Sequence, residues 1–387
     1  MRNSAFRIPP SAFILAVLCL AIFQFSENTA DPDLWSHVFF GAQFIHTGKP
    51  ATIDYYSWTA YGRPSFDHEY LGEVVLGLAY LCLGGPGLLL LKIIVGLLTF
   101  GIALSMNRRA GPASRLQVDG AFRGQPQSNL RLEAPSTGRP DACPANTMLV
   151  AWSFGALAVV EISFGFAARP QIFTALSLAI ELWLLRRIHS GDWQWALALP
   201  PLFALWFNLH GGALAGLGLL LIAAAATSAQ ILFTELAPIA HAPQVSKPAV
   251  PPISKSAAAR PPTTGRFGSL RYSRLGSLRS HFTRVAIPLW ISALVSAGTV
   301  VLNPHGIELA RWLVDSVLKH PPGIQEWNPT ALSWNHAAFF FCAAIAAVAF
   351  VFSRCQRQWW EAAVLTVLFI VGIREVRNTP LFCIAAL

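Results

Sequence analysis

The chain has 387 residues, of which 54% are hydrophobic and only 12% are charged, and its mean hydropathy is +0.49. A soluble domain carries roughly 25% charged residues, so this composition excludes an ordinary soluble protein and indicates an integral α-helical membrane protein. The net charge of +9 does not indicate nucleic-acid binding, because the basic residues gather in low-complexity loops without a basic helix or an aromatic platform.

Apolar runs of about 20 residues predict the membrane helices. The first, over 8–25, is expected to be an uncleaved helix, because no small-residue cleavage site follows it. A polar and aromatic loop over 27–69 comes next. An amphipathic helix over 70–83 is expected to lie along the membrane surface, and Gly84-Gly85-Pro86 should separate it from a second membrane helix over 87–106.

Two low-complexity segments interrupt the later helices, an arginine-rich loop over 107–146 and a basic linker over 234–284. The last apolar stretch, 380–387, is too short to cross a membrane and is expected to be a truncated tenth helix. Complete helices are predicted over 147–166, 170–185, 195–209 (with Pro200-Pro201 as a kink), 212–233, 285–302, 336–352 and 359–373. The five parts of the chain are therefore 1–106, 107–146, 147–233, 234–284 and 285–387.

These elements predict an all-α, polytopic bundle of about nine complete membrane spans plus the truncated tenth. The loops after every second helix carry the Lys and Arg excess, which places them and the amino terminus in the cytoplasm. The short polar motifs at the other helix ends then share the extracytoplasmic face. We expect a multi-pass protein of a bacterial inner membrane whose active face is extracytoplasmic and whose partners include membrane lipids.

Two clusters of acidic residues and histidines follow the first helix. Asp31 and Asp33 come directly after it, and His37 shares a helix face with Asp33 if this stretch is helical. The second cluster opens the amphipathic helix and consists of Asp67, His68 and Glu69. Two carboxylate clusters in one outer loop are suited to general-base chemistry on a hydroxyl group. The alternative is that Asp33 and Asp67 only cap helices.

Cationic and polar residues recur at the same ends of later helices. A guanidinium there can hold a phosphate with two parallel hydrogen bonds, and an imidazole beside a Gly-Gly pair can donate to a phosphate oxygen. The alternatives are lipid-headgroup anchoring for the arginines and a polar helix end for the histidine. The candidate phosphate-binding residues are Arg169, His210, Arg374 and Arg377. Further polar motifs of this face contain Asn303, His305 and Glu326.

No cofactor is expected. Asp33, His37, His68 and Glu69 are residue types that a divalent ion accepts, but their spacing matches no defined metal site, so a metal is only a minor alternative. The cysteines show no Cys-x-x-Cys pair, which argues against a zinc site or a disulfide framework.

Several motifs carry a family resemblance. The segment over 31–73 reads DPDLWSHVFFGAQFIHTGKPATIDYYSWTAYGRPSFDHEYLGE, and AARPQIFT, FNLHGG, LNPHG, IQEWNP and VRNTPLF follow in that order. The chain thereby resembles bacterial GT-C membrane glycosyltransferases, a superfamily related to the dolichyl-phosphate-mannose protein mannosyltransferases and the lipid A sugar transferases. The resemblance implies a polyprenyl-phosphate sugar donor. It also implies a catalytic acid at Asp33, with Asp31 as the near rival, and a second acid at Glu69.

The sequence therefore favours an enzyme: an inverting glycosyltransferase that moves a sugar from a polyprenyl-phosphate donor to a lipid, glycan or protein acceptor. Asp33, aided by His37 or Glu69, would remove the proton of the acceptor hydroxyl. A transporter or flippase for a lipid-linked or anionic solute is the alternative, for which Glu161 and Glu181 are the only acids inside predicted spans. A non-catalytic membrane scaffold or pseudoenzyme is the third reading, which the expected truncation would favour.

Overall fold

The structure, a computed structural model, describes residues 9–59, 61–106, 145–236, 282–318, 325–352 and 358–387. Over these ranges it is helical, and its only β-type pairing is an isolated bridge between Ile53 and Pro64. The predicted all-α class is confirmed. The loop over 107–146 and the linker over 234–284 lie almost entirely outside the described residues.

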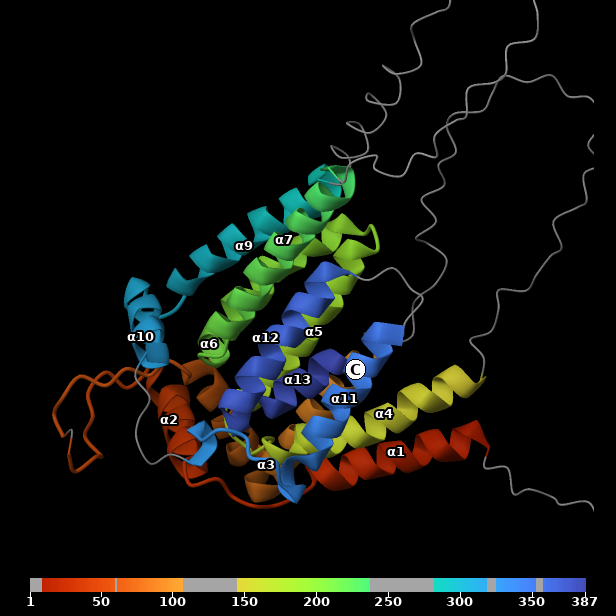
Figure 1. The fold of residues 1–387 in the computed structure, drawn as a ribbon. Coiled ribbons are helices and arrows are strands. Elements are labelled where there is room, and N and C mark those ends of the chain that lie inside the picture. The colour runs from red at the N-terminus through yellow and green to blue at the C-terminus, as the bar shows by residue number, and fades with distance from the viewer. Residues whose placement is uncertain (1–8, 60, 107–144, 237–281, 319–324, 353–357) are drawn as a thin grey trace, which may run out of the picture.

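Most of the helices follow the apolar runs of the sequence to within a few residues (Figure 1). Their bounds are α1 (Pro10–Phe25), α2 (Leu34–Thr47), α3 (Tyr70–Met106), α4 (Ala145–Phe164), α5 (Gln171–His189), α6 (Leu199–Leu209), α7 (Ala213–Leu236), α9 (Ile287–Gly298), α10 (Ile307–Leu318), α11 (Ala337–Phe352), α12 (Trp359–Arg374) and α13 (Thr379–Ala386).

Two local details differ from the sequence prediction. Pro200 and Pro201 do not kink a helix from within. They open α6 after a short 3-10 turn over Trp193–Ala198, where the first-turn prolines need no backbone N–H. The helix α10, in turn, lies in a stretch that the sequence indicated only as polar.

The expected break in α3 is present at Gly84. Its backbone is non-helical, with φ of 64° and ψ of −148°, a conformation that glycine adopts without the steric cost that a side chain adds. The first half of α3 packs on α2 in backbone contact: a Cβ on Gly41 would lie 1.8 Å from the carbonyl oxygen of Glu73. This close crossing brings polar residues of α2 and α3 together.

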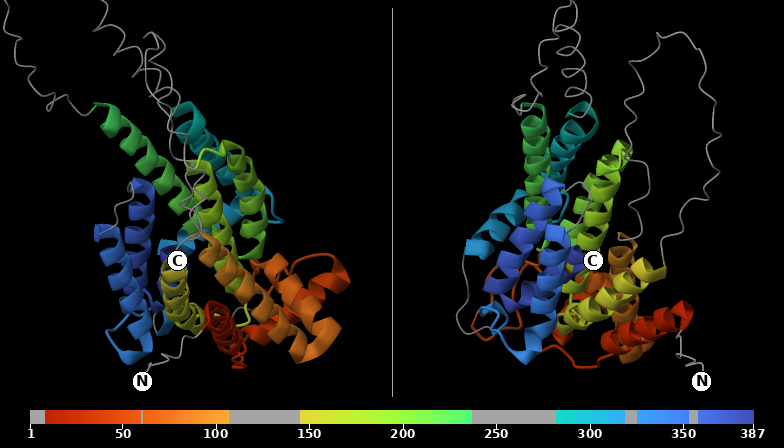
Figure 2. Two further views of the ribbon diagram at one scale, coloured as in Figure 1. Left: turned by 90° about the vertical axis from the view of Figure 1, so that its right-hand side faces the viewer. Right: turned by 45° about the vertical axis from the view of Figure 1, so that its right-hand side comes forward.

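The other helices form a bundle in which α7 packs against both α9 and α12, and α5 against α3 and α6 (Figures 1 and 2). The helix α1 lies beside α4. The short α13 contacts α4, α5, α11 and α12, and its last residue, Leu387, is buried. One large apolar core runs through these contacts, with Phe203, Trp206 and Phe339 among its fully buried side chains.

Four helical segments are long and apolar enough to cross a membrane by length and composition: Tyr70–Met106, Ala213–Thr234, Phe282–Val301 and Trp334–Phe352. Shorter apolar helices cover Pro10–Phe25 and Leu149–Phe164. Large apolar side chains such as Leu294 and Phe352 point away from the protein, as expected for helices that face lipid. The chain thus has the features of a membrane protein.

Candidate functional site

The polar motifs converge at one end of the bundle, where α3 and α5 begin and where α6 and α12 finish. Contacts and electrostatic interactions join side chains from distant segments into one group, which we call the polar cluster. Its members are Asp31, His37, Asp67, His68, Glu69, Glu73, Arg169, His210, His305, Glu326 and Arg377. All of these except Glu73 were candidates from the sequence.

Glu69 lies at the centre of the polar cluster. Its Oε1 atom is 2.9 Å from Nε2 of His68 and 3.3 Å from Nε2 of His210. Although burial disfavours the charged carboxylate, the neighbouring His210 and His68 lower the pKa of Glu69 to about 2. Glu69 is therefore an ionised hydrogen-bond acceptor at neutral pH and a poor proton acceptor.

Hydrogen bonds hold His210 in one tautomer. The backbone N–H of Gly212 donates to its Nδ1 over 2.9 Å, and the Thr174 hydroxyl lies 2.8 Å from the same nitrogen. Trp206 Nε1 donates to Thr174 Oγ1 over 3.0 Å, so the Thr174 proton is free to point at His210. Burial lowers the pKa of His210 to about 4. The neutral imidazole thus carries its proton on Nε2, facing Glu69.

The helix α2 contributes His37, whose Nδ1 lies 2.9 Å from Oε1 of the buried Glu73. Although burial disfavours a charged imidazole, the hydrogen bond to Glu73 and the charges of Glu69 and Asp33 raise the pKa of His37. The expected turn between Asp33 and His37 is present, with a backbone hydrogen bond of 3.2 Å. Asp33 occupies the N-cap position of α2 without a capping hydrogen bond, and its side chain is exposed.

Asp67 and His305 join the start of α3 to the segment before α10. Asp67 Oδ1 accepts the backbone N–H of Glu69 over 3.2 Å, just before α3 begins, so this bond shapes the turn that leads into the helix and does not cap the helix itself. The Asp67 carbonyl lies 2.7 Å from His305 Nε2, and His305 stacks on Phe66 with ring centroids 4.0 Å apart. Burial raises the pKa of Asp67. Asn303 shapes the turn before α10, because its Oδ1 accepts the His305 N–H over 2.7 Å.

Arg169 bridges two carboxylates. Its Nη1 lies 3.3 Å from Asp31 Oδ2, and its Nη2 pairs with Glu326, which is 157 positions away in the chain. The Arg169 and Asp31 side chains are only 16% and 11% exposed. The guanidinium that the sequence indicated for phosphate binding is thus occupied by two carboxylates of the protein itself, and it joins three segments.

Arg377 has a more open environment. Its guanidinium lies 4.1 Å from the ring centroid of Trp327, and its Nε is 3.6 Å from Glu375 Oε2. The side chain is 38% exposed. Arg374, at the end of α12, is exposed and makes no ion pair or side-chain hydrogen bond within the described ranges. Among the sequence candidates for phosphate binding, Arg377 combines membership of the cluster with an accessible charge.

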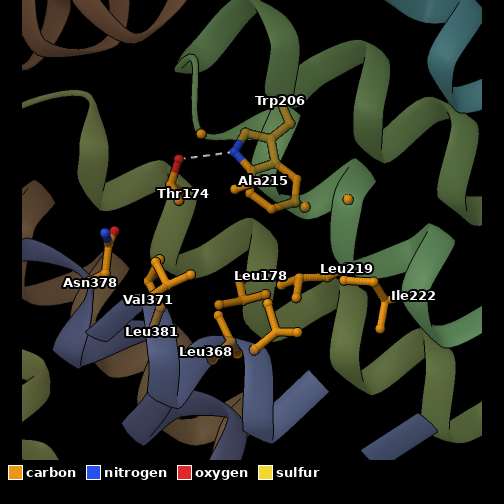
Figure 3. A pocket seen from close by; sticks show the side chains of 14 residues that line it. Thr174, Leu178, Trp206, Ala215, Leu219, Ile222, Leu368, Val371, Asn378 and Leu381 are labelled. Atoms are coloured by element: carbon orange, nitrogen blue, oxygen red, sulfur yellow. Dashed lines mark hydrogen bonds between the residues drawn. The ribbon is translucent and has the colours of Figure 1, made fainter. Parts of the chain in front are cut away.

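Figure 3 shows the side chains that line an apolar cavity of about 190 Å³. Two of them, Thr174 and Gly212, hydrogen-bond to His210 of the polar cluster. At one end the cavity is lined by the residues that hold His210, namely Thr174, Trp206 and Gly212, and by Asn378 next to Arg377. The rest of its wall is apolar and comes from α5, α7, α12 and α13, with Leu178, Leu219, Ile222, Leu368, Val371 and Leu381. The cavity surface is therefore almost wholly apolar, and the cavity adjoins the polar cluster at Thr174, Trp206 and Gly212.

Within the described ranges, no group of three or more His, Cys, Asp or Glu side chains is arranged to hold a metal ion. Comparisons of the chain with protein-family models, with curated proteins and with solved structures found no match.

Sequence reasoning missed three side chains that complete the site. Glu73 occupies what looks like an ordinary polar position of an amphipathic helix. Its spacing of one helical turn from Glu69 is the sequence signal that could have indicated it. Thr174 and Trp206 lie in the motifs AARPQIFT and just before FNLHGG, but their hydrogen bond joins positions 32 residues apart. Only the packing of α5 against α6 reveals it.

Proposed function

We propose that the chain is a membrane glycosyltransferase that takes a sugar from a polyprenyl-phosphate donor and attaches it to a hydroxyl group of a lipid, glycan or protein. The observation that carries this proposal is the junction of the polar cluster with the apolar cavity through Thr174, Trp206 and Gly212. A donor with a charged phosphate and a long apolar tail needs such a pair of environments side by side.

In this proposal the chain crosses a bacterial inner membrane about nine times, with the amino terminus in the cytoplasm and the polar cluster on the extracytoplasmic face. The short apolar helices, such as α1 and α4, count among the spans. The donor tail lies in the cavity between α7 and α12, and its phosphate lies outside the cavity beside Arg377, next to the lining residue Asn378.

The reaction is a displacement at the anomeric carbon. The acceptor oxygen forms a bond to that carbon, the bond from the carbon to the phosphate oxygen breaks, and the bonding electrons leave with the polyprenyl phosphate. Arg377 stabilises the negative charge that develops on the phosphate. Arg169 pairs with Asp31 and Glu326, which limits their repulsion of the phosphate. A base of the cluster receives the proton of the acceptor hydroxyl.

The test is binding of a radiolabelled polyprenyl-phosphate sugar to the purified full chain, with release of the sugar to an acceptor alcohol as a second readout. Loss of one charge-assisted contact costs about 1.5–3 kcal/mol, so Arg377→Gln should weaken donor binding about 10- to 100-fold. Arg311→Gln is the matched control, because Arg311 is exposed and its one ion pair among the described residues is with its helix neighbour Glu308. Wild-type protein that binds no donor, or binds it no better than the unphosphorylated polyprenol, would refute the proposal.

A specific observation favours a second candidate, transport of a lipid-linked solute. Glu181 in α5 is fully buried, and neither of its carboxylate oxygens has a hydrogen-bond partner among the described residues. It lies near the cavity wall, because a Cβ on Gly216 would be 3.0 Å from Glu181 Oε2. Transporters place ionisable groups inside their membrane-spanning bundle in this way. Movement of a fluorescent polyprenyl-phosphate lipid across proteoliposomes, abolished in Glu181→Gln and without sugar release, would favour this function over transfer.

A further inference from the structure

His68 has a fixed ring orientation. Its imidazole packs against Trp312 of α10, with ring centroids 3.9 Å apart. Gly211 also lies beside the ring, because a Cβ on Gly211 would be in van der Waals contact with His68 Cδ2 at 3.4 Å. With Nε2 directed at Glu69 Oε1 over 2.9 Å, the opposite ring edge, which carries Nδ1, points away from that carboxylate.

The chemistry of Glu69 decides which nitrogen of His68 carries the proton in the neutral ring. An ionised carboxylate only accepts hydrogen bonds, so Nε2 donates and Nδ1 keeps its lone pair. Nδ1 makes no hydrogen bond to the described residues and is not among their buried unpartnered atoms, and the side chain is 24% exposed. The Nδ1 lone pair is therefore open to a bound molecule.

The other histidines of the cluster differ from His68. Both nitrogens of His210 are engaged, Nδ1 by Gly212 and Thr174 and Nε2 by Glu69. The contact of His305 is to a backbone carbonyl and not to a carboxylate. His37 pairs with Glu73 and has a raised pKa, which favours its charged, proton-donating form.

We propose that His68 is the proton acceptor of this site, oriented by Glu69, whose Oε1 atom also contacts Nε2 of His210. The role of His68 in sugar transfer rests on the proposed function. As the acceptor oxygen bonds to the anomeric carbon, its proton moves to Nδ1 of His68, and the electron pair of the breaking carbon–oxygen bond leaves on the phosphate. The resulting imidazolium is stabilised by the Glu69 carboxylate and returns its proton to water. Asp33, which the sequence indicated for this role, is exposed and is not part of this hydrogen-bonded arrangement.

The first test does not depend on the reaction. Diethyl pyrocarbonate is attacked by an open imidazole lone pair, which gains an ethoxycarbonyl group as ethyl carbonate leaves. Applied to the full chain in lipid nanodiscs and read by mass spectrometry, it should modify His68 at least as fast as the exposed reference His46. His210 should react about tenfold more slowly, because its Nδ1 hydrogen bonds must first break. A reactive His46 beside an unmodified His68 would overturn the proposal.

The second test uses sugar release. His68→Gln should slow release about 100-fold or more, the usual contribution of a general base, whereas Asp33→Asn should change it less than about tenfold. Added imidazole should restore release in His68→Ala, a rescue that a purely structural role does not predict. Wild-type release that survives in His68→Gln would refute the assignment of His68. Absence of release from the wild type would instead refute the proposed function, and diethyl pyrocarbonate would then decide whether His68 has an open lone pair.

Discussion

Thr174 in α5 and His210 at the end of α6 are joined by a hydrogen bond of 2.8 Å between Oγ1 and Nδ1. The bond fixes the histidine tautomer, and through it the N–H that faces Glu69. Because Thr174 also lines the apolar cavity, the same hydroxyl group joins the polar cluster to the interior of the bundle.

Replacing Thr174 tests this junction. Thr174→Val keeps the shape of the side chain but removes the acceptor for Trp206 Nε1 and the donor to His210. An unpaired buried N–H costs about 1–3 kcal/mol, so unfolding by denaturant in mild detergent should show a loss of about 2 kcal/mol. Thr174→Ser keeps the hydroxyl and should retain most of the stability. Equal losses for the two variants would show that the methyl group, and not the hydroxyl, is what the site requires.

Stability should fall in weakly acidic solution because of His210. Its pKa is about 4 in the folded protein, against an ordinary value of 6.5 for a histidine in an unfolded chain. The unfolded chain takes up a proton first, so the stabilisation is fully present above pH 6.5 and is lost as the pH falls toward 4, by about 3 kcal/mol at most. His37 acts in the opposite sense, but its raised pKa adds stability as the pH falls to 6.5, and below that pH its contribution stays constant. His210→Gln should flatten the decline between pH 6.5 and 4.5, whereas His46→Gln should leave its slope unchanged.

Arg169 should be important for stability even without a ligand. Arg169→Met leaves Asp31 and Glu326 close to each other without their shared cation, which we expect to cost on the order of 2–3 kcal/mol. The triple change that adds Asp31→Asn and Glu326→Gln removes the stranded charges and should recover part of the loss. A single Arg169→Met variant as stable as the wild type would show that the bridge has no net stabilising effect.

The crossing of α2 and α3 should not tolerate a side chain at Gly41. A Cβ there would overlap the Glu73 carbonyl, so Gly41→Ala must push the helices apart and should destabilise the protein by about 1–3 kcal/mol. Gly101→Ala is the matched control, since no atom lies within 4 Å of its Cβ position and alanine favours a helix by about 0.5–1 kcal/mol. Circular dichroism melting of both variants compares the two effects.

Much of the fold follows from local sequence. Apolar runs define most helices, and the Gly84-Gly85-Pro86 turn defines the break in α3, because glycine and proline restrict the backbone directly. The helix α2 was expected only conditionally, and α10 was missed, because polar and aromatic residues interrupt both apolar patterns. The helix α2 packs on α3, and α10 packs on Phe66 and His68 through Trp312, contacts that no local pattern contains.

The sequence predicted which residues form the site better than it predicted which of them contact each other. The polar motifs indicated which residues would gather, and most of them do. The pairing of Arg169 with Glu326 spans 157 positions, and the sharing of Glu69 between two histidines depends on the packing of α3 against α6, so no local pattern contains either. The roles of Arg169 as a bridge and Arg377 as the accessible cation follow from these contacts.

The central claim is that one amphiphilic donor occupies both the polar cluster and the adjoining cavity. The most direct measurement is photolabelling of the full chain with a polyprenyl-phosphate sugar that carries a diazirine in its first isoprene units, followed by mapping of the adducts. Our account predicts adducts on cavity residues such as Leu219 and Leu368, lost in the cavity-filling variant Gly218→Leu and weakened in Arg377→Gln. Adducts confined to exposed apolar positions such as Leu221, and unchanged in both variants, would contradict it.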